Sequence, residues 1–503
     1  MTDAQHWPQP AQPAQPGQPA QPVPPPLGQV QPDPPAVPEQ PWQQAQQPWP
    51  AHPAPAPHPH LEVDRAAAAT AARGRSLAPD LARGLMLLLI ALANVPWWLF
   101  GAEHGLTNAH GVGHEGADLG YQLFSLVAID GRAYPLFAFL FGYGIWQLYS
   151  RQSAAGTPWR TARRLLQLRH LWMLAFGAVH ALLLWFGDIV GAYGLTGLIV
   201  AWLLLRRSDR ALKIVAWVLA SLLLLSGALM LVGAAVLSSS GIADSLPDLG
   251  GFTVSPAGES NYLLFMLASF GAWLLATPGQ VIALTVPLAA VLGILAARRG
   301  LLDRPEEHRA TLARIAVGGI LIGWTGGALA ALQFAGALFA PSIAWGTMGI
   351  SSLAGVAGGI GYAALFGLIA AAISRRSARG DVQHAHDGRL EGQQVEGQQV
   401  DGQQRATQRH GIVTRTITAV GKRSLSSYLL QSVLFAPILA AWGLGLGETI
   451  SPLGAAGLAV GVWLVTAIVA VVLDLQGKRG PAEALLRRLA YGKRQVAAPT
   501  PVV

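Results

Sequence analysis

The stretch of sequence that decides the fold is residues 163–207, RRLLQLRHLWMLAFGAVHALLLWFGDIVGAYGLTGLIVAWLLLRR. Arginines stand at both of its ends, and the about 40 residues between them suffice for two membrane crossings of roughly 20 apolar residues each. A tight turn at Phe186-Gly187-Asp188 would join the two helices. The sequence therefore predicts a helical hairpin in a membrane.

The composition of the whole chain is that of a polytopic membrane protein. Of its 503 residues, 52% are hydrophobic and 12% are charged, against roughly 25% charged residues in a soluble domain. The mean hydropathy is +0.39. Because helices satisfy their own backbone hydrogen bonds in lipid, these values predict an all-α transmembrane bundle with the lipid bilayer as its partner.

The charge and the cysteine count exclude several classes of function. A net charge of +8 does not indicate a nucleic-acid partner here, because the basic residues stand at the ends of apolar segments. The chain has no cysteine, which excludes disulfides, thiolate metal sites and cysteine nucleophiles.

Low-complexity segments divide the chain into five parts. Residues 1–75 form a Pro-, Gln- and Ala-rich tail that we expect to be disordered, as a spacer or as a docking site for a protein partner. Residues 76–374 hold helices 1–8 of the predicted bundle. The stretch 375–420, with its EGQQVEGQQVDGQQR repeat, is predicted to be a flexible cytoplasmic loop. Residues 421–494 hold a final helix pair, and 495–503 form a disordered tail.

Ten crossings account for the apolar segments: 83–101, 131–149, 165–186, 189–205, 213–237, 278–297, 315–337, 346–373, 424–444 and 454–473. If both termini are cytoplasmic, only Arg132 of the 34 basic residues falls on the outer side. This asymmetry follows the positive-inside rule. It predicts a multi-pass protein of the cell (cytoplasmic) membrane with the 186–188 turn outside.

Two of the apolar segments are too long for one helix. Charge parity favours a single crossing in each of 119–149 and 261–297, preceded by a short apolar stretch that lies at the outer interface or re-enters the bundle. Glycine and proline interrupt helices where the bundle can satisfy the freed backbone groups. We therefore expect breaks at Asp130-Gly131 and Pro278-Gly279.

Polar residues on the cytoplasmic side of the first helix form one candidate site. Asp80 and Arg83 are three residues apart and share a helical face. An arginine fork at this depth suits a phosphate, either of a lipid headgroup or of a coenzyme, although an Asp80–Arg83 pair that merely anchors the helix is the alternative. Asn94, deeper in the same helix, is a candidate binding residue or an interhelical hydrogen-bond partner.

The outer side gathers titratable residues at helix ends that the topology makes neighbours: His104, His110, His114, Glu115, Asp118, Asp130, Arg132, His180 and Asp188. A histidine oriented by a carboxylate can act as a general base or as an acyl-accepting nucleophile. We expect His180 and Asp188 to face the bundle interior, near Arg132 or another polar partner. A simple interhelical histidine is the alternative for His180. His110, His114 and Asp118 could together hold a metal, but their Gly-rich loop fixes no ligand geometry, so no metal is predicted.

Five motifs in order resemble the YeiB-like bacterial membrane proteins that carry domain of unknown function 418: PDLARGLMLLLIALANV, YPLFAFLFGYG, HALLLWFGDIVGAYGLTGL, GKRSLSSYLLQSVL and GPAEALLRRLAYG. The resemblance covers about residues 76 to 494. That family has no settled activity, so the resemblance implies a fold and not a reaction.

More distantly, the Asp80-x-x-Arg83-Gly start, the Pro-Leu-Phe segment at 135–137 and the Tyr428 helix are similar to heparan-glucosaminide acetyltransferases and other membrane acyltransferases. The resemblance implies acyl transfer from cytoplasmic acyl-CoA, a donor substrate and not a bound cofactor, to a small-molecule or lipid-linked acceptor outside. A histidine after the first helix carries the acyl step in the acetyltransferase group, and His104 is its nearest counterpart. Other members place a histidine ten residues after an arginine, where this chain has Ala93 and Asn94.

Two further classes of function compete with acyl transfer. A transporter or flippase of lipid-linked or amphiphilic substrates would use His180 and Asp188 to relay protons or to bind cargo. A non-catalytic envelope protein would need no chemistry at all. For the enzyme, the sequence nominates His104, His180 and Asp188 as catalytic residues; it nominates as substrate-binding residues Asp80, Arg83, Asn94, Asp130 and Arg132.

Overall fold

The computed structural model describes residues 76–104, 107–246, 255–390 and 411–492. The tails predicted at 1–75 and 495–503, including the docking site for a protein partner, lie outside these residues. Within the described part the chain is helical, and its strand-like pairing is one isolated bridge between His104 and Gly111. The predicted all-α bundle is confirmed.

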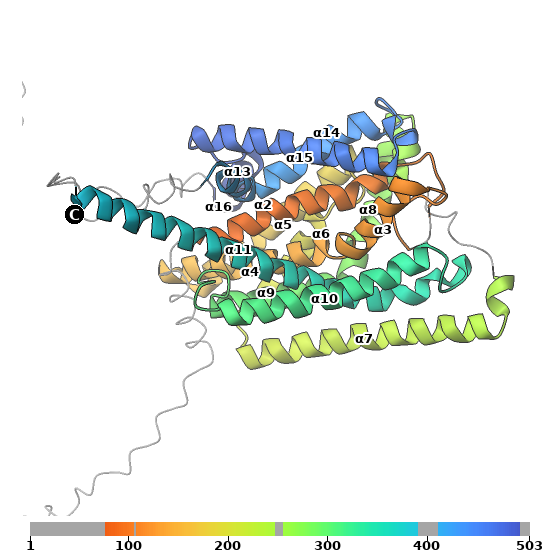
Figure 1. Ribbon diagram of the computed structural model, residues 1–503, viewed down its shortest axis with the longest axis horizontal. Coiled ribbons are helices and arrows are strands. Elements are labelled where there is room, and N and C mark those ends of the chain that lie inside the picture. Colours follow the sequence, from red (N-terminus) through yellow and green to blue (C-terminus); the bar gives the residue numbers. More distant parts are fainter. Residues whose placement is uncertain (1–75, 105–106, 247–254, 391–410, 493–503) are drawn as a thin grey trace, which may run out of the picture. The chain divides into compact units, whose positions relative to one another are not determined.

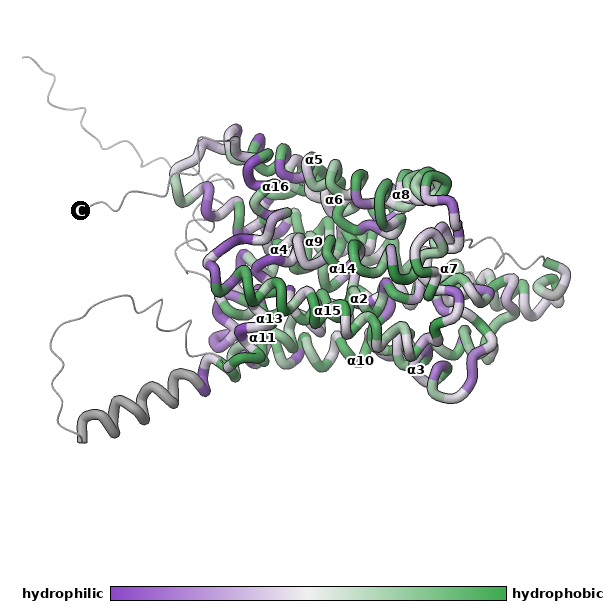
Figure 2. Tube along the Cα trace, turned by 90° about the horizontal axis from the view of Figure 1, so that it is seen from above, coloured by the Kyte–Doolittle hydropathy of each residue, from purple (hydrophilic) through white to green (hydrophobic). Residues whose placement is uncertain are grey.

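The helices run mostly along one direction and form a single bundle (Figure 1). They are α2 (Leu77–Asn94), α3 (Gly116–Ala128), α4 (Ala133–Ala154), α5 (Trp159–Leu183), α6 (Val190–Leu203), α7 (Asp209–Ser239), α8 (Tyr262–Ile282), α9 (Thr285–Arg299), α10 (Arg309–Phe334), α11 (Met348–Leu390), α13 (Ile412–Lys422), α14 (Ser424–Leu439), α15 (Pro452–Leu475) and α16 (Pro481–Tyr491), with short 3₁₀ turns between some of them. Hydrophobic residues dominate the middle of the bundle, and hydrophilic ones gather toward its ends (Figure 2).

Seven helical segments of the described chain are long and apolar enough to cross a membrane: Leu77–Trp98, Gly116–Ala154, Asp209–Ser239, Tyr262–Ile282, Arg309–Phe334, Pro341–Arg376 and Pro452–Leu475. Six of them coincide with predicted crossings. The predicted crossings 189–205 and 424–444 appear as the shorter apolar helices α6 and α14. The protein is therefore a membrane protein built from these helices.

The segment 261–297 differs from its prediction in where the helix breaks. The stretch expected to lie at the outer interface or to re-enter the bundle is part of the 21-residue helix α8, which continues through Pro278 to Ile282. The chain breaks instead at Leu284, whose φ of 64° is left-handed. A proline can stay inside a membrane helix when neighbouring groups satisfy the carbonyl it frees. The other predicted break is present, because Gly131 separates α3 from α4 with φ 72°.

The bundle has two chemically different ends. We call one the basic end, where Arg298 donates to the carbonyls of Leu205 and Arg207 at the turn between α6 and α7. We call the other the histidine end, which holds the loop 99–115. The 186–188 turn lies at the histidine end, since Trp185 stacks on Trp98 with ring centroids 4.4 Å apart.

Contacts at the two ends of the bundle fix the direction of α8 and α9. The Tyr262 hydroxyl, at the start of α8, donates to the Leu183 carbonyl at the histidine end over 3.0 Å. The last turn of α9 holds Arg298 at the basic end. Together α8 and α9 therefore cross the bundle once. The distribution of basic residues predicted this single crossing.

Helix α11 extends further than expected. It continues to Leu390, into the stretch predicted as a flexible loop from residue 375. Adding a residue to an existing helix costs little, and the Ala- and Arg-containing stretch after 374 favours it. The Gly-Gln-Gln repeat begins only beyond Leu390, and 391–410 lie outside the described residues.

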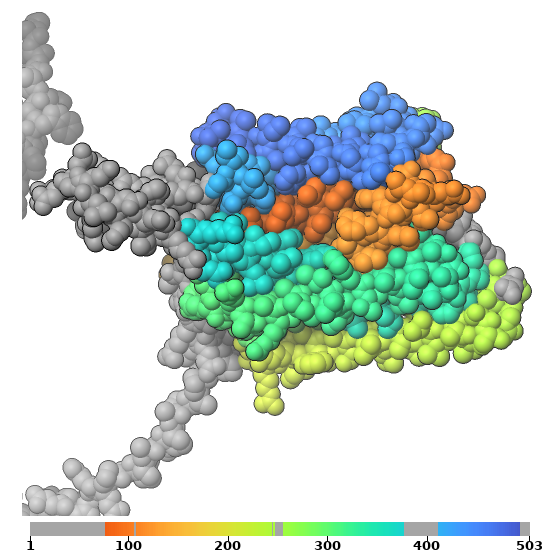
Figure 3. Space-filling model, in the orientation of Figure 1, coloured from red at the N-terminus to blue at the C-terminus, as the bar shows by residue number. Residues whose placement is uncertain are grey.

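Glycines four residues apart predict close helix packing at three places: Gly319, Gly323 and Gly327; Gly355 and Gly359; and Gly457 and Gly461. A Cβ at Gly319 or Gly323 would overlap the backbone of α11, and one at Gly359 would overlap that of α4. The expectation was wrong for Gly457 and Gly461, which are exposed and have no neighbour within 4 Å. They belong to α15, which lies on the outside of the bundle (Figure 3).

Helices α4 and α9 give a test of this packing. A Cβ at Gly142 would overlap the Ala290 carbonyl group, so we expect Gly142→Ala to force α4 and α9 apart and to lower the free energy of unfolding by about 1–3 kcal/mol. Thermal unfolding of the detergent-solubilised protein measures it. Gly461→Ala is the matched control and should be neutral or stabilising, because alanine favours helix. Equal effects of both changes would contradict the packing.

Single cysteines test the orientation, since the chain has none of its own. Ala155 and Ser239 are both exposed, Ala155 at the basic end and Ser239 at the histidine end. We expect Ser239→Cys to react with a membrane-impermeant thiol reagent in intact cells, and Ala155→Cys to react only after lysis. The reverse pattern would place the basic end outside.

Candidate functional site

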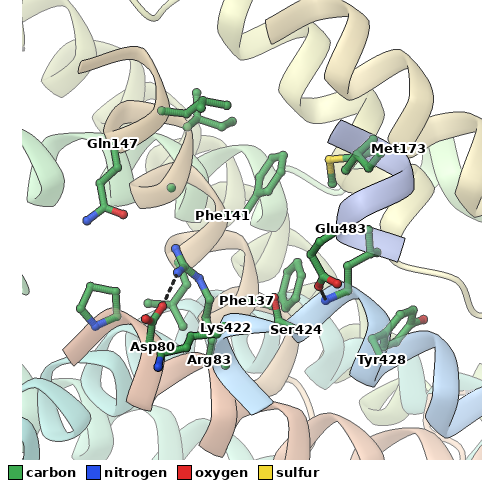
Figure 4. A pocket seen from close by; sticks show the side chains of 18 of the residues that line it. Asp80, Arg83, Phe137, Phe141, Gln147, Met173, Lys422, Ser424, Tyr428 and Glu483 are labelled. Carbon is green, nitrogen blue, oxygen red and sulfur yellow. Dashed lines mark hydrogen bonds and ion pairs between the residues drawn. The ribbon is translucent and has the colours of Figure 1, made fainter. Parts of the chain in front are cut away.

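A cavity of about 320 Å³ opens at the basic end. Helices α2, α4, α5, α14 and α16 surround it, and it is lined by charged residues near its mouth and apolar ones in its depth. We call it the inner cavity. Figure 4 shows Asp80 and Arg83 on one side of it and Glu483 on the other, with Tyr428 beyond.

Four basic residues line the inner cavity: Arg83, Arg151, Arg169 and Lys422. Two acidic residues accompany them, and both are engaged. Asp80 accepts from Arg83 Nη1 at 3.3 Å, and Glu483 accepts from the backbone N–H groups of Leu425 and Ser426 at 2.8 and 3.1 Å. The lining is therefore net positive and suits an anion.

Local sequence explains why these groups meet. Ser76 caps α2 by accepting from the Ala78 N–H, and its hydroxyl donates to the Leu302 carbonyl, which fixes the first turn of the helix. Gly84 and Gly421 let α2 and α13 approach until a Cβ at either would overlap the other backbone. This contact brings Lys422 beside the first turn of α2. The predicted Asp80–Arg83 pair is thus present and faces a cavity.

The depth of the inner cavity is apolar. Its walls include Met86, Phe137, Phe141 and Met173, and Tyr428 stands at the far side. A basic mouth above an apolar interior matches a molecule with an anionic head and a hydrocarbon or pantetheine-like tail.

Behind Tyr428 lies a buried histidine and carboxylate pair. His180 Nδ1 and Asp188 Oδ1 are 2.8 Å apart, and their side chains are 2% and 0% exposed. Asp188 Oδ2 also accepts from the Gly191 N–H at 2.6 Å and from Trp273 Nε1 at 3.4 Å. The His180 ring meets the Tyr428 ring edge-on at 5.3 Å. The approach of the pair across the Gly187 turn agrees with the sequence prediction.

The pair has the geometry of an oriented base. Asp188 on the Nδ1 side favours the tautomer with hydrogen on Nδ1, which leaves the lone pair on Nε2. His180 Nε2 is buried and has no hydrogen-bond partner among the described residues. A buried unpaired nitrogen is costly, and a base or nucleophile needs such an atom.

Arg132 does not join this pair, contrary to one expectation. Its guanidinium donates to backbone carbonyls, at 2.9 Å to Leu126 and also to Asp130 and Gly323. These carbonyls engage both terminal nitrogens of the guanidinium, and its Nε is buried without a hydrogen-bond partner among the described residues. Arg132 thereby ties α4 to α3 and α10.

A second cavity, of about 190 Å³, lies toward the histidine end. We call it the outer cavity. Its lining includes Ala93, Asp130, Arg132 and Tyr134. Asp130 Oδ2 is 2.7 Å from His110 Nε2, which makes a second histidine and carboxylate pair. The predicted Asp130 and Arg132 are thus brought together in one cavity.

The wall between the two cavities is thin. On α4, Tyr134 lines the outer cavity and Phe137, three residues on, lines the inner one, a separation of about 4.5 Å along the helix. The wall is polar in part, because the Tyr134 hydroxyl donates to Asn94 Oδ1 at 2.7 Å. The Tyr193 hydroxyl donates to the Tyr134 carbonyl at 2.9 Å. Asn94 therefore serves as an interhelical partner in this wall.

His104 lies apart from His180. It pairs with Gly111 in the isolated bridge of the loop 99–115, and its Nε2 is buried without a hydrogen-bond partner in the described chain. Burial, with a contribution from His110, lowers the pKa of His104 below its usual range. His104 is therefore neutral near pH 7, but it lines neither of the two cavities.

The side chains considered for a metal have separate partners. His110 binds Asp130, His114 bonds the Gly111 carbonyl at 3.1 Å, and Asp118 accepts from the Leu453 N–H at 2.8 Å. Among the described residues no group of three metal-ligating side chains gathers.

Several residues of the site were missed from the sequence. Arg169 stood near the cytoplasmic start of the predicted crossing 165–186, where an arginine is expected at the headgroups, so its place in a cavity was not signalled. Glu483, which lines the cavity, and Trp273, which contacts Asp188, gave no signal, because their roles depend on helices distant in sequence. Tyr428 was noted only through the resemblance.

The comparison with family models bears on the second half of the chain. Residues 296–384 and 403–493 match the family described as "Protein of unknown function (DUF418)". The resemblance to this family that the sequence motifs predicted is therefore confirmed. Tyr428, Lys422 and Glu483 of the inner cavity fall within the DUF418 match, whereas Arg83 and the His180–Asp188 pair fall outside it.

Two similar proteins are bacterial. The chain is 29% identical to "Uncharacterized protein YxaH" of Bacillus subtilis (strain 168) over 209 residues, which is 39% of this chain and 50% of YxaH. It is 33% identical to "Uncharacterized protein YeiB" of Escherichia coli (strain K12) over 132 residues, 26% of this chain and 31% of YeiB. The chain thus spans half of one relative and about a third of the other.

A double-mutant cycle tests the coupling of the buried pair. Asp188→Ala leaves His180 Nδ1 unpaired, so we expect a loss of about 1–3 kcal/mol in the free energy of unfolding. In a His180→Ala background the same change should cost clearly less. Equal costs in both backgrounds, measured by thermal unfolding, would show that the two side chains do not interact.

Proposed function

We propose that this protein binds an amphiphile with a phosphorylated head in the inner cavity and transfers an acyl group from it. Acyl-CoA is the donor that fits the sequence resemblance and this chemistry. The observation that carries the proposal is the inner cavity itself, with a basic mouth, an apolar depth and Tyr428 in front of the His180–Asp188 pair.

The mouth of the cavity would hold the phosphates of the donor. Arginine guanidinium groups bind phosphate through two parallel hydrogen bonds, and Arg83 and Arg169 line this space from two different helices. Asp80 orients Arg83 through their 3.3 Å contact. The tail would extend along Phe137 and Phe141, which places the acyl end toward Tyr428.

His180 would act as the base of the transfer once Tyr428 turns aside. Its Nε2 would take the proton from the hydroxyl or amine of an acceptor as that group attacks the thioester carbonyl. The carbon–sulfur bond then breaks, the electron pair leaves with sulfur, and the thiolate receives the proton from His180. Asp188 would stabilise the imidazolium between these steps.

The acceptor would approach from the outer cavity. The polar wall with Asn94 and Tyr134 separates that cavity from the inner one, and Asp130 and Arg132 would bind the acceptor, a small molecule or a lipid-linked group. The positive-inside rule predicts that the basic end lies on the cytoplasmic side of the cell membrane. The donor would then be cytoplasmic and the acceptor external. His104, outside both cavities, is the weaker choice for the acyl step.

Transport is the second candidate, and one observation favours it. Two cavities that open toward opposite ends, with a thin wall that contains titratable groups, are also what alternating access requires. In that case His180 and Asp188 would bind cargo or relay protons. A non-catalytic envelope role would use neither cavity.

Binding and transfer assays with labelled acyl-CoA distinguish acyl transfer from transport. Purified protein should bind it; Arg83→Ala should weaken binding about tenfold or more, whereas Arg314→Ala, a basic-end residue outside the cavity, should not. His180→Ala should retain donor binding and lower transfer about 100- to 10,000-fold, whereas His308→Ala, which lies outside both cavities, should leave it unchanged.

The opposite results decide against the proposal. Full transfer in His180→Ala would remove the base from the mechanism. Binding of an amphiphile that crosses the bilayer unchanged in proteoliposomes would favour transport. No binding of any acyl-CoA by the native protein would reject the donor site.

A further inference from the structure

A third cavity lies at the basic end but faces the surface of the bundle. Its volume is about 250 Å³, and we call it the α7 groove. It is lined by residues of α4, α7, α9, α10 and α11 and of the turn after α9: Phe139, Lys213, Leu292, Leu295, Ala296, Arg299, Leu301, Leu302, Leu312, Ile315, Ile360 and Ala364. It shares no lining residue with the inner cavity.

Packing explains why the groove exists. Helix α10 lies close to α11 through Gly319 and Gly323, and α7 approaches α11 through Gly227, nearer the middle of the bundle. The basic-end halves of α7 and α10 are therefore held against the same helix without filling the space between them. Ala296 and Ala364 in the floor are too small to close it. Figure 3 shows α7 along the edge of the bundle, next to α10.

Two cations border this apolar space. Lys213 belongs to the first turns of α7 and Arg299 is the last residue of α9, and both side chains are exposed. Neither forms an ion pair or a side-chain hydrogen bond with any described residue. The nearest acidic candidate on α7, Asp209, is engaged by Arg298 at 2.6 Å. The two charges are thus available to a ligand.

We propose that the α7 groove binds an anionic phospholipid. The phosphate would lie between Lys213 and Arg299, and one acyl chain would run along Leu292, Leu312 and Ile315 toward the middle of the membrane. Basic pockets between membrane helices bind anionic headgroups, and long basic side chains reach to the headgroup level from such a depth. A zwitterionic lipid would leave the positive charge of the site uncompensated.

The site differs from the inner cavity in a way that an experiment can use. Its lining is apolar apart from the two cations at one end, and it opens to the side of the bundle where lipid is the solvent. Val317 and Leu321, further along α10, are both 62% exposed and continue this lipid-facing surface. The proposal therefore stands whether or not the inner cavity binds acyl-CoA.

Native mass spectrometry of the full chain tests the proposal directly. The protein in a nonionic detergent is titrated with phosphatidylglycerol or with phosphatidylcholine of the same acyl chains. We expect one phosphatidylglycerol to bind roughly thirtyfold more tightly than phosphatidylcholine, from two cations near the surface. The double variant Lys213→Gln/Arg299→Gln should lose this preference. Melting temperatures of the variants confirm that they fold.

Two controls make the outcome decisive. Arg210→Gln/Arg309→Gln removes the same charge from exposed residues of α7 and α10 that do not line the groove, and it should keep the preference. Glycerol 3-phosphate, a headgroup without chains, should not displace the lipid. Equal affinity for the two lipids, loss of preference in the control variant, or displacement by glycerol 3-phosphate would each overturn the proposal.

Discussion

The constraint on which this structure depends is that the membrane interior has no water to satisfy a polar group. An unpaired buried charge or backbone group costs several kcal/mol there, so every polar residue at depth must find its partner within the protein. Arg132 meets most of this demand with three backbone carbonyls, while its Nε has no partner among the described residues, and Asp188 meets it with His180, Gly191 and Trp273. His180 Nε2 is one of several buried polar atoms without a partner in the described chain, and it belongs to a histidine that a carboxylate orients.

The same constraint decides how much could be predicted from sequence. The all-α bundle follows from the length of the apolar segments, which the thickness of the bilayer sets. The assignment of helix ends to one side or the other follows from the position of the arginines. The His180–Asp188 contact was also within reach, since it spans one glycine turn. The wrong details depend on neighbours: Pro278 stays helical because the surrounding backbone tolerates it, and Gly457 packs against nothing because α15 lies at the edge.

The candidate site shows the limit of single-sequence reasoning more sharply. Asp80 and Arg83 were predicted as a pair, but the cavity they face is completed by Lys422, Arg169 and Glu483 from three other helices. No spacing in the sequence records such convergence, because it arises from helix packing at Gly84 and Gly421. Asp130 and Arg132 do meet in one cavity, but Arg132 also donates to three backbone carbonyls through Nη1 and Nη2, and its Nε is the nitrogen without a partner among the described residues.

The position of Tyr428 connects these observations. It lines the inner cavity, its ring covers His180, and its hydroxyl accepts from the Ile189 N–H at 3.4 Å, directly after Asp188. A hydrogen bond at that distance is weak, so the cost of moving the phenol comes mainly from the packing of its buried ring. The His180–Asp188 pair is held by the shorter 2.8 Å contact, and Tyr428 is the residue that would have to move for a ligand of the cavity to reach it. An amphiphile long enough to reach Tyr428 would supply the apolar contact that compensates for that movement.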